Sequence, residues 1–567
     1  MEVWILLYFI YHLFSNSVFF GIFQVQKVHM SHRYISILFW LSIFVYLLLG
    51  MNSFIFTYPD EGRNAFATLY MIKSGEYIVP YYNGEIRYDK PPLLYYLAAI
   101  SYKFLSFFGV EKVEFSFRLV SALATFFSSI IVYELSKYFI SGLFYRYFSV
   151  VVYVSLSNVF VESKAFVPEP LLSLFINLCL LSFYKIYHEN NLRWNIVFWI
   201  SLGLGMLAKG IIAVIIVFLV IFCYLLIKKD LGSIKLIFRN LYSVFLGLLV
   251  GVSWFVMVGI KTQGDFIYKF IMIHNLGRFT GTSKMHLNPL YFYIIVIFVN
   301  IVPLFEIFAV SLYSFIRSLL DKQRTYSFPP NFSFLFVYFL SIFIFYSLSQ
   351  GKVHHYIMPC YIPFSILLAY FTEKYISLYF NRLVLLLSFI LPLLILFQRV
   401  SQDFILIKNA LLVLLTAFNL VYFIIPKRFL VIAVIVKIFL FYMFIVSQVD
   451  KSFPNQNKLL ELIKDNYILK VGDISTLSFY NLYINNCHKT PDLFYAIQLQ
   501  RIDETIYLDI VRNLENNRKV IIFTKPRYLQ KMMRILDKLR ISNLDTQINK
   551  VTVAQSVIFA ITLDLDK

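Results

Sequence analysis

Long apolar stretches separated by short polar connections recur through most of this chain and determine which solvent it folds in. The 567 residues are 60% hydrophobic, with a mean hydropathy of +0.73, which is more apolar surface than a water-soluble core of this size could enclose. We therefore expect a polytopic α-helical membrane protein with about thirteen transmembrane helices. The apolar segments lie at residues 34–56, 116–140, 144–161, 171–187, 195–209, 210–227, 242–260, 289–316, 331–349, 357–373, 383–398, 408–425 and 429–447.

The net charge of +20 indicates orientation in the membrane. The basic residues are spread through short connections between apolar segments and do not form one patch, which argues against nucleic-acid binding. Every second connection is basic, for example those that carry Lys228, Lys229 and Arg239, and the positive-inside rule places these in the cytoplasm. Loops 57–115, 161–170 and 261–288, together with the C-terminal region, are then expected to face outward.

The chain divides into three parts. Residues 1–33 form an N-terminal extension, for which two interpretations compete: an extra anchor helix, or a start assigned too early with Met30 as the true first residue. Residues 34–449 form the membrane domain, in which the apolar stretch 91–108 is interrupted by Lys103 and is expected to lie in the outer interface. Residues 450–567 are predicted to form a small α/β domain outside the membrane. Its expected helices lie at 457–464, 506–515 and 526–539, and its expected strands at 467–471, 519–523 and 555–563.

Charged residues gather in the first outer loop, although only 14% of the chain is charged. Asp60 and Glu61 follow the first apolar segment directly, and Asp89 and Lys90 precede the interfacial stretch. Carboxylates beside a membrane are costly, so a functional role is the default expectation. Such a loop can bind a cation and a lipid phosphate at the membrane surface. The alternative is that each acid caps a helix or pairs with a local base such as Arg63.

The later outer loops contain further candidates. Glu169 lies between two prolines, and His274 precedes Arg278 by four residues, so that both would face the same way on one helical turn. A neutral imidazole can bind a divalent cation, and a guanidinium can bind phosphate oxygens in a fork. Lys209 lies at a tight hairpin between two apolar segments. The alternative to a functional role is that its side chain only extends to the membrane–water interface, as lysines at helix ends often do. The adjacent histidines at 354 and 355 lack the spacing of a metal-binding face on a helix.

Several short motifs in order along the chain carry a family resemblance. They are YPDEGR at 58–63, SGEY at 74–77, NG at 83–84, RYDKPPL at 87–93, LAKG at 207–210, HNLGRFTG at 274–281, SLSQGK at 347–352 and YIMP at 356–359. Over roughly residues 34 to 370 the chain resembles the bacterial aminoarabinose transferases of lipid A. That family belongs to the C-type membrane glycosyltransferases and is similar to the protein O-mannosyltransferases.

The resemblance implies a role for each matching position. Asp60 is expected to be the essential catalytic acid of the first loop. Glu169 is expected to be a second catalytic acid, at a position where the family more often has an Asp. Asp89 and His274 are implied ligands of a divalent metal ion, whether Zn, Mg or Mn. The residues implied in binding the phosphate of the lipid carrier are Lys90, Arg278, Lys209, Tyr356 and Arg63.

The implied function is an inverting transfer of an amino sugar from undecaprenyl phosphate to lipid A on the periplasmic face of the bacterial inner membrane. Aminoarabinose and galactosamine are both open as the sugar, and a monomer is expected. One alternative is a protein O-mannosyltransferase-like enzyme or another transferase that uses a polyprenyl-linked sugar. A second is a lipid flippase or transporter, which predicts charged residues near the middle of the spans.

Overall fold

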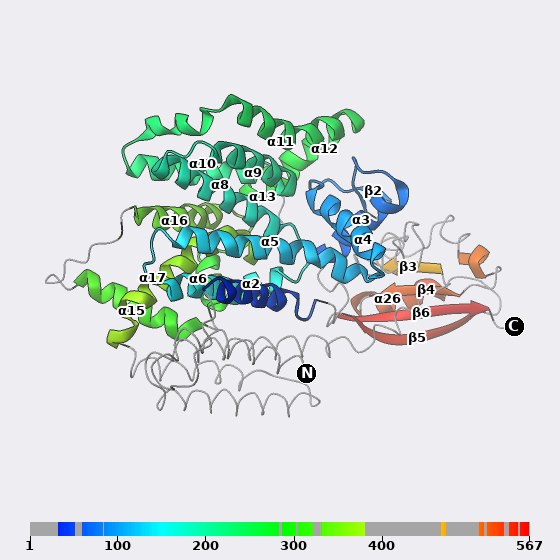
Figure 1. Cartoon of the computed structure of the whole chain (residues 1–567). Coiled ribbons are helices and arrows are strands. Elements are labelled where there is room, and N and C mark those ends of the chain that lie inside the picture. The colour runs from blue at the N-terminus through cyan, green and yellow to red at the C-terminus, as the bar shows by residue number, and fades with distance from the viewer. Residues whose placement is uncertain are drawn as a thin grey trace.

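The structure is a computed structural model in which one helical bundle carries a cap of short elements at one end (Figure 1). It describes residues 32–379 apart from 52–58, 83, 283–285, 302–303, 321–328 and 330; in the C-terminal region it describes 467–471, 510–514, 519–524, 526–537, 544–553 and 556–565. The N-terminal extension up to residue 31 and the expected spans at 383–398, 408–425 and 429–447 lie outside the described residues, as does the expected helix at 457–464.

The bundle consists of apolar helices close to the segments expected from the sequence. They are α2 (His32–Leu48), α5 (Val113–Ser136), α6 (Leu143–Ser155), α8 (Glu169–Glu189), α9 (Trp194–Lys209), α10 (Ile212–Ile227), α11 (Leu241–Lys261), α16 (Ser333–Leu348) and α17 (Tyr361–Tyr379). Among the described residues, α5, α8 and α11 are both long enough and apolar enough to cross a membrane on their own. The remaining helices of the bundle are shorter or less uniformly apolar.

Two expected spans are divided in the structure. The segment 289–316 forms α14 (Phe292–Asn300) and α15 (Phe305–Leu320), so the prediction of one continuous helix there was wrong. The sequence has Pro303 between them, and a proline inside a helix removes a hydrogen-bond donor and clashes with the preceding turn. The segment 144–161 likewise divides into α6 and the short α7 (Ser157–Glu162).

Helices α9 and α11 cross closely because glycines face each other. A Cβ atom on Gly203 would lie 2.4 Å from the carbonyl oxygen of Gly247, and one on Gly247 would lie 2.4 Å from the carbonyl oxygen of Trp199. Only glycine permits this approach, which is common where helices pack in lipid without a hydrophobic driving force between them.

The loop at 57–115, which the sequence predicts to face outward, folds into a cap at one end of the bundle (Figure 1). It comprises α3 (Pro59–Ser74), the hairpin of β1 (Tyr81–Tyr82) and β2 (Glu85–Ile86), and α4 (Leu93–Phe107), which corresponds to the expected interfacial helix. The indole of Trp254 in α11 donates a hydrogen bond of 2.9 Å to the carbonyl oxygen of Ile78, which fastens the cap to the bundle.

The C-terminal region contains a four-stranded sheet with the order β3-β4-β6-β5, at the same end of the bundle as the cap (Figure 1). Strands β3 (Tyr467–Val471) and β4 (Val520–Thr524) are parallel, whereas β5 (Leu544–Val553) and β6 (Ser556–Leu565) are antiparallel. Helix α26 (Pro526–Leu536) packs on β4 and β6. Strands near β3, β4 and β6 were predicted from the sequence, whereas β5 was not, because its alternating polar residues dilute the apolar pattern.

Candidate active site

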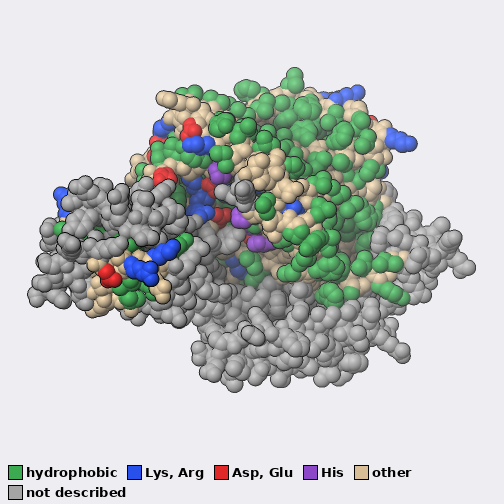
Figure 2. Space-filling model, turned by 180° about the vertical axis from the view of Figure 1, so that it is seen from behind, with side chains coloured by type: hydrophobic (Ala, Val, Ile, Leu, Met, Phe, Trp, Pro, Cys, Tyr) green, Lys and Arg blue, Asp and Glu red, His purple; other side chains and the backbone are tan. Residues whose placement is uncertain are grey.

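Two adjoining hollows lie between the cap and the bundle. The first, here called the lipid groove, has a volume of about 340 Å³ and is lined largely by apolar side chains of α10, η2 (Lys269–Leu276) and α16. The second, here called the polar cavity, has a volume of about 450 Å³ and lies under the cap. The two share one wall, which consists of Asp89, Lys90, His274, Arg278 and Tyr356. Figure 2 shows basic, acidic and histidine side chains gathered in a recess with hydrophobic side chains beside it.

The structure gives the two neighbouring acids of α3 different surroundings. Asp60 lines the polar cavity, and its carboxylate lies 3.7 Å from Arg63, one turn further along the helix. Glu61 instead points into the protein, where its two oxygens accept hydrogen bonds of 2.9 and 3.1 Å from the guanidinium of Arg118 in α5. Glu61 also accepts from the backbone N–H of Phe166 at 2.8 Å. Asp60 therefore faces the site and Glu61 anchors the helix that carries it.

The segment after β2 brings a dense set of charges to the shared wall. Arg87 Nε lies 2.9 Å from Asp89 Oδ1, and Arg87 Nη2 donates to Asn64 Oδ1 at 2.9 Å, which fixes the segment against α3. Burial alone would raise the pKa of Asp89, but Arg87 and Lys90 lower it to about 2, so the carboxylate is ionised. Burial would lower the pKa of Lys90, but the carboxylates of Glu169, Asp60 and Asp89 raise it. Lys90 is thus held as a buried cation.

His274 and Arg278 reach the same wall from the loop at 261–288. His274 lies in the π-helix η2 (Lys269–Leu276) and Arg278 in the short α13 (Gly277–Thr280). The backbone N–H of Gly351 bonds to the carbonyl of Arg278, which ties this segment to the loop before η4 (His354–Cys360). Burial lowers the pKa of His274, so the imidazole is neutral at pH 7. Within the described residues, His274 Nδ1 and Arg278 Nε are buried and have no hydrogen-bond partner.

The half-buried Lys209 and the buried Glu169 form an ion pair beside this wall. Lys209 ends α9, and Gly210 then turns the chain with φ +85°, in a space where a Cβ atom would lie 2.5 Å from the ring of Phe270. Lys209 Nζ lies 2.8 Å from Glu169 Oε1 and 4.1 Å from the ring centre of Tyr356. Burial would raise the pKa of the Tyr356 phenol, but Lys209 and Arg278 lower it.

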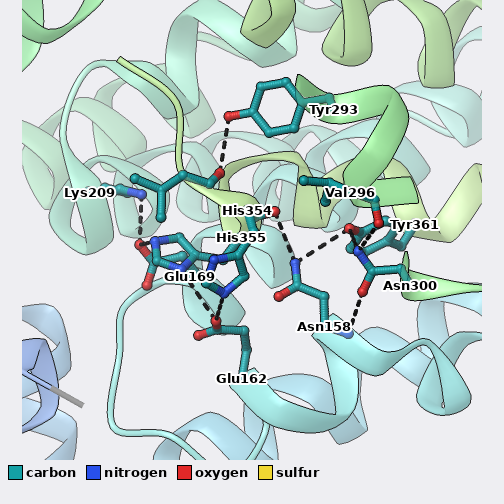
Figure 3. A network of polar contacts seen from close by, with 11 residues as sticks. Asn158, Glu162, Glu169, Lys209, Tyr293, Val296, Asn300, His354, His355 and Tyr361 are labelled. Atoms are coloured by element: carbon teal, nitrogen blue, oxygen red, sulfur yellow. Dashed lines mark hydrogen bonds and ion pairs between the residues drawn. The ribbon is translucent and has the colours of Figure 1, made fainter. Parts of the chain in front are cut away.

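Glu169 lies behind Lys209 and does not line either hollow. It begins α8 with Pro170 after it, as suits an acid and a proline in the first turn of a helix. His355 bridges it to a second buried acid, with Nε2 3.2 Å from Glu169 Oε1 and Nδ1 3.3 Å from Glu162 Oε1 (Figure 3). Burial would lower the pKa of His355, but the two carboxylates raise it to about 10.

The structure therefore brings the residues singled out in the sequence into one region. Asp60, Arg63, Asp89, Lys90, His274, Arg278 and Tyr356 all line the polar cavity, and Lys209 lines the lipid groove. Arg118 and Glu162 were not singled out from the sequence, and His355 was set aside together with His354. Arg118 is the one basic residue of the otherwise largely apolar α5, which is a signal that could have marked it. Glu162 and His355 gave no such signal, because their contact depends on the fold.

Comparisons with known proteins show which family the chain resembles. The family model of dolichyl-phosphate-mannose-protein mannosyltransferases matches residues 89–257. An Aquifex aeolicus protein without an assigned function is 35% identical over 59% of this chain and 72% of its own length. The undecaprenyl phosphate-alpha-4-amino-4-deoxy-L-arabinose arabinosyl transferase of Wigglesworthia glossinidia brevipalpis is 29% identical over 59% of this chain. The matching region spans 57% of that enzyme, little more than half its length.

The fold is also found in a solved structure. The crystal structure of ArnT from Cupriavidus metallidurans bound to undecaprenyl phosphate aligns with a TM-score of 0.68 and covers 94% of this chain and 98% of that one, at 16% sequence identity. The likeness shows a shared fold, and the curated sequence relatives indicate the family. The chain therefore belongs to the family of membrane glycosyltransferases that contains the undecaprenyl phosphate aminoarabinose transferases and is related to the dolichyl-phosphate-mannose-protein mannosyltransferases.

Proposed function

We propose that this protein transfers a sugar from an undecaprenyl phosphate carrier to an acceptor at the outer surface of the membrane. The observation that carries the proposal is the wall shared by the lipid groove and the polar cavity. This wall places cationic and hydrogen-bonding groups where the lipid groove meets the polar cavity. A prenyl phosphate sugar has the same order of parts: an apolar chain, an anionic phosphate and a polar sugar.

In this arrangement each part of the donor has its own surroundings. The prenyl chain lies in the lipid groove beside Ile212, Ile215 and Phe345, and the sugar enters the polar cavity. The phosphate lies at the shared wall, within reach of Lys90 and Arg278. The unpartnered Nε of Arg278 supports this assignment, because a buried guanidinium donor without an acceptor is costly and a phosphate oxygen would satisfy it.

The chemistry follows from a donor that carries its own leaving group. As the bond from C1 of the sugar to the phosphate oxygen breaks, negative charge grows on the phosphate and positive character grows at C1. Lys90 and Arg278 stabilise the phosphate charge, which is the kind of electrostatic contribution that usually dominates catalysis. The acceptor attacks from the opposite face and inverts the anomeric centre. Asp60 then serves as general base if the acceptor is a hydroxyl, or orients the acceptor if that acceptor is an anionic phosphate.

Glu169 acts on this chemistry through Lys209. Its carboxylate is 3% exposed and lies 2.8 Å from the ammonium group, so it holds Lys209 beside Tyr356 at the wall of the groove. Glu169 is therefore a positioning residue in this proposal, and Asp60 is the acid that touches the substrate.

The residues present fit a divalent metal ion at the shared wall. The carboxylate of Asp89 is ionised, and His274 is neutral with an unpartnered buried Nδ1, which leaves an imidazole lone pair available. Asp89 and His274 would hold the ion, which when bound would add positive charge next to the leaving phosphate. Arg87, Lys90 and Arg278 already surround Asp89, so the ion would need the negative charge of the phosphate to bind well.

At the finer level, we propose that the transferred sugar is an amino sugar, either aminoarabinose or galactosamine, and that the acceptor is lipid A at the periplasmic face of the bacterial inner membrane. The names of the curated relatives and the positive-inside pattern support this assignment. A monomer suffices, because the groove, the cavity and their shared wall come from one chain. A flippase is disfavoured because the charged side chains gather under the cap and not midway along the helices.

Mass spectrometry of lipid A from cells with and without the gene tests the finer proposal. A pentosamine increment that depends on the gene identifies aminoarabinose, and a hexosamine increment identifies galactosamine. If the mass of lipid A does not depend on the gene, lipid A is not the acceptor. A search for glycosylated membrane proteins in the same cells would then test the protein O-mannosyltransferase-like alternative.

A further inference from the structure

We propose that Glu162, His354 and His355 form a divalent metal site, distinct from the Asp89 and His274 pair. Glu162 ends α7, and the two histidines begin η4, almost 200 residues later in the chain. One ligand atom from each residue lies within 4.8 Å of the other two, and no other group of three or more such side chains among the described residues meets this condition. Adjacent histidines rarely suit one helical face, but the turn at the start of η4 directs both rings toward Glu162 (Figure 3).

The distances suit a tetrahedral ion of the zinc type. Glu162 Oε1 lies 3.2 Å from His354 Nε2 and 3.3 Å from His355 Nδ1. Zinc bonds to nitrogen and oxygen are roughly 2.0–2.1 Å long, so ligand atoms at two corners of a tetrahedron lie about 3.3 Å apart. Both distances from the oxygen to a nitrogen already match this spacing, and the three ligand atoms lie within 4.8 Å of one another.

The second nitrogen of His355 strengthens the case. His355 Nε2 lies 3.2 Å from Glu169 Oε1, on the other side of the ring from Glu162. A histidine that binds a metal through one nitrogen usually donates its other N–H to a carboxylate or carbonyl, which fixes the ring and the tautomer. Glu169 is placed to accept that N–H. The ion, the ring of His355 and the carboxylate of Glu169 would then lie in the order that is usual at metal sites.

The backbone around the histidines is held rigidly. The side-chain amide of Asn158 donates to the carbonyl oxygen of His354 at 3.1 Å. The backbone N–H of Asn158 donates to the side-chain oxygen of Asn300 at 2.5 Å (Figure 3). Asn300 in turn donates to the hydroxyl of Tyr361 at 2.9 Å. A preformed turn loses little conformational entropy when it binds an ion, which favours affinity.

Burial and charge agree with a cation at this place. The side chains of Glu162 and His355 are each 4% exposed, and a second buried carboxylate, Glu169, lies on the far side of the imidazole. Buried carboxylates need compensating positive charge, and since Lys209 already pairs with Glu169, Glu162 is the carboxylate that an ion would compensate. The side chain of His354 is 44% exposed, which gives an ion an entry path and leaves room for water as a fourth ligand.

A metal here would act by positioning. It would tie the second outer loop to η4 and fix the ring of His355 beneath Glu169, and Glu169 holds Lys209. The ion would not need to touch the sugar or the phosphate. The proposal does not depend on which sugar or acceptor the enzyme uses.

The test uses the full-length protein in detergent, stripped with a chelator and titrated with Co²⁺ alone, whose absorption spectrum reports tetrahedral binding. We expect a tetrahedral spectrum from the wild type, and a loss of affinity of at least about tenfold in His354→Gln, the magnitude found even for outer-shell changes. His286→Asn is the matched control, because His286 lines the polar cavity outside this cluster and has φ +56°, which asparagine tolerates. His274→Gln should keep the spectrum, since it removes a ligand of the other pair.

Three results would overturn the proposal. The first is the absence of a tetrahedral spectrum from the wild type, and the second is unchanged affinity in both His354→Gln and Glu162→Gln. The third is a spectrum lost in His274→Gln and kept in His354→Gln, which would assign the ion to Asp89 and His274 instead. X-ray absorption of the cobalt-loaded wild type counts the histidine ligands directly, with two expected, and it decides the question if a variant fails to fold.

Discussion

The neighbouring acids of α3 should respond in opposite ways to the same chemical change. Glu61→Gln removes the charge that faces Arg118, whose side chain is fully buried, while that of Glu61 is 2% exposed. Removing one partner of a buried ion pair leaves an uncompensated charge and costs about 3–5 kcal/mol. Asp60→Asn alters a side chain that is 32% exposed and lies 3.7 Å from Arg63, so its effect on stability should stay within about 0.5 kcal/mol.

The assay is equilibrium unfolding in mixed micelles, paired with a transfer assay that uses a purified polyprenyl-linked donor. We expect Glu61→Gln to lower the free energy of unfolding by about 3–5 kcal/mol. Asp60→Asn should keep the wild-type free energy of unfolding and lose transfer. The reasoning fails if Asp60→Asn destabilises the protein as much as Glu61→Gln does, or if it retains near-normal turnover in a correctly folded sample.

Three further changes test other parts of the structure. Arg278→Ala should weaken binding of undecaprenyl phosphate by roughly 1.5–3 kcal/mol, because a hydrogen bond to a charged group is lost, and a binding titration with the labelled lipid would show this. Ile215→Trp should narrow the lipid groove and raise KM for a donor with a long prenyl chain more than for one with a short chain. An equal rise in KM for both donors would show that the prenyl chain does not bind in this groove. Gly247→Ala should lower the unfolding midpoint through an overpacking cost of about 1–3 kcal/mol, because its Cβ would lie 2.4 Å from a backbone oxygen of α9. An unchanged midpoint would show that α9 and α11 can move apart without loss of stability.

The sequence was informative where the physical cause is local. Apolar segments of membrane length predicted the positions of α5, α8, α9 and α10 closely, because a helix in lipid must satisfy its own backbone hydrogen bonds. The basic connections and the clustered acids of the first loop directed attention to the region where the two hollows lie. The interruption of the segment 289–316 was missed, although Pro303 marks it, because apolar composition alone does not register a broken helix.

The sequence was uninformative where the cause is a contact between distant residues. Asp60 and Glu61 are adjacent acids with the same local signal, and only the position of Arg118, 57 residues after Glu61, separates the anchor from the acid that faces the cavity. His354 and His355 were set aside because their spacing does not suit one helical face. The structure places them in a turn against Glu162, which no local pattern could indicate.

The central claim is that one wall, shared by an apolar groove and a polar cavity, receives the phosphate of a prenyl carrier. An electron cryo-microscopy map of the full-length protein with undecaprenyl phosphate tests it directly. The account predicts density for the phosphate beside Lys90 and Arg278, with the prenyl chain running past Ile215. Density for the phosphate outside both hollows, or a prenyl chain in the polar cavity, would contradict it.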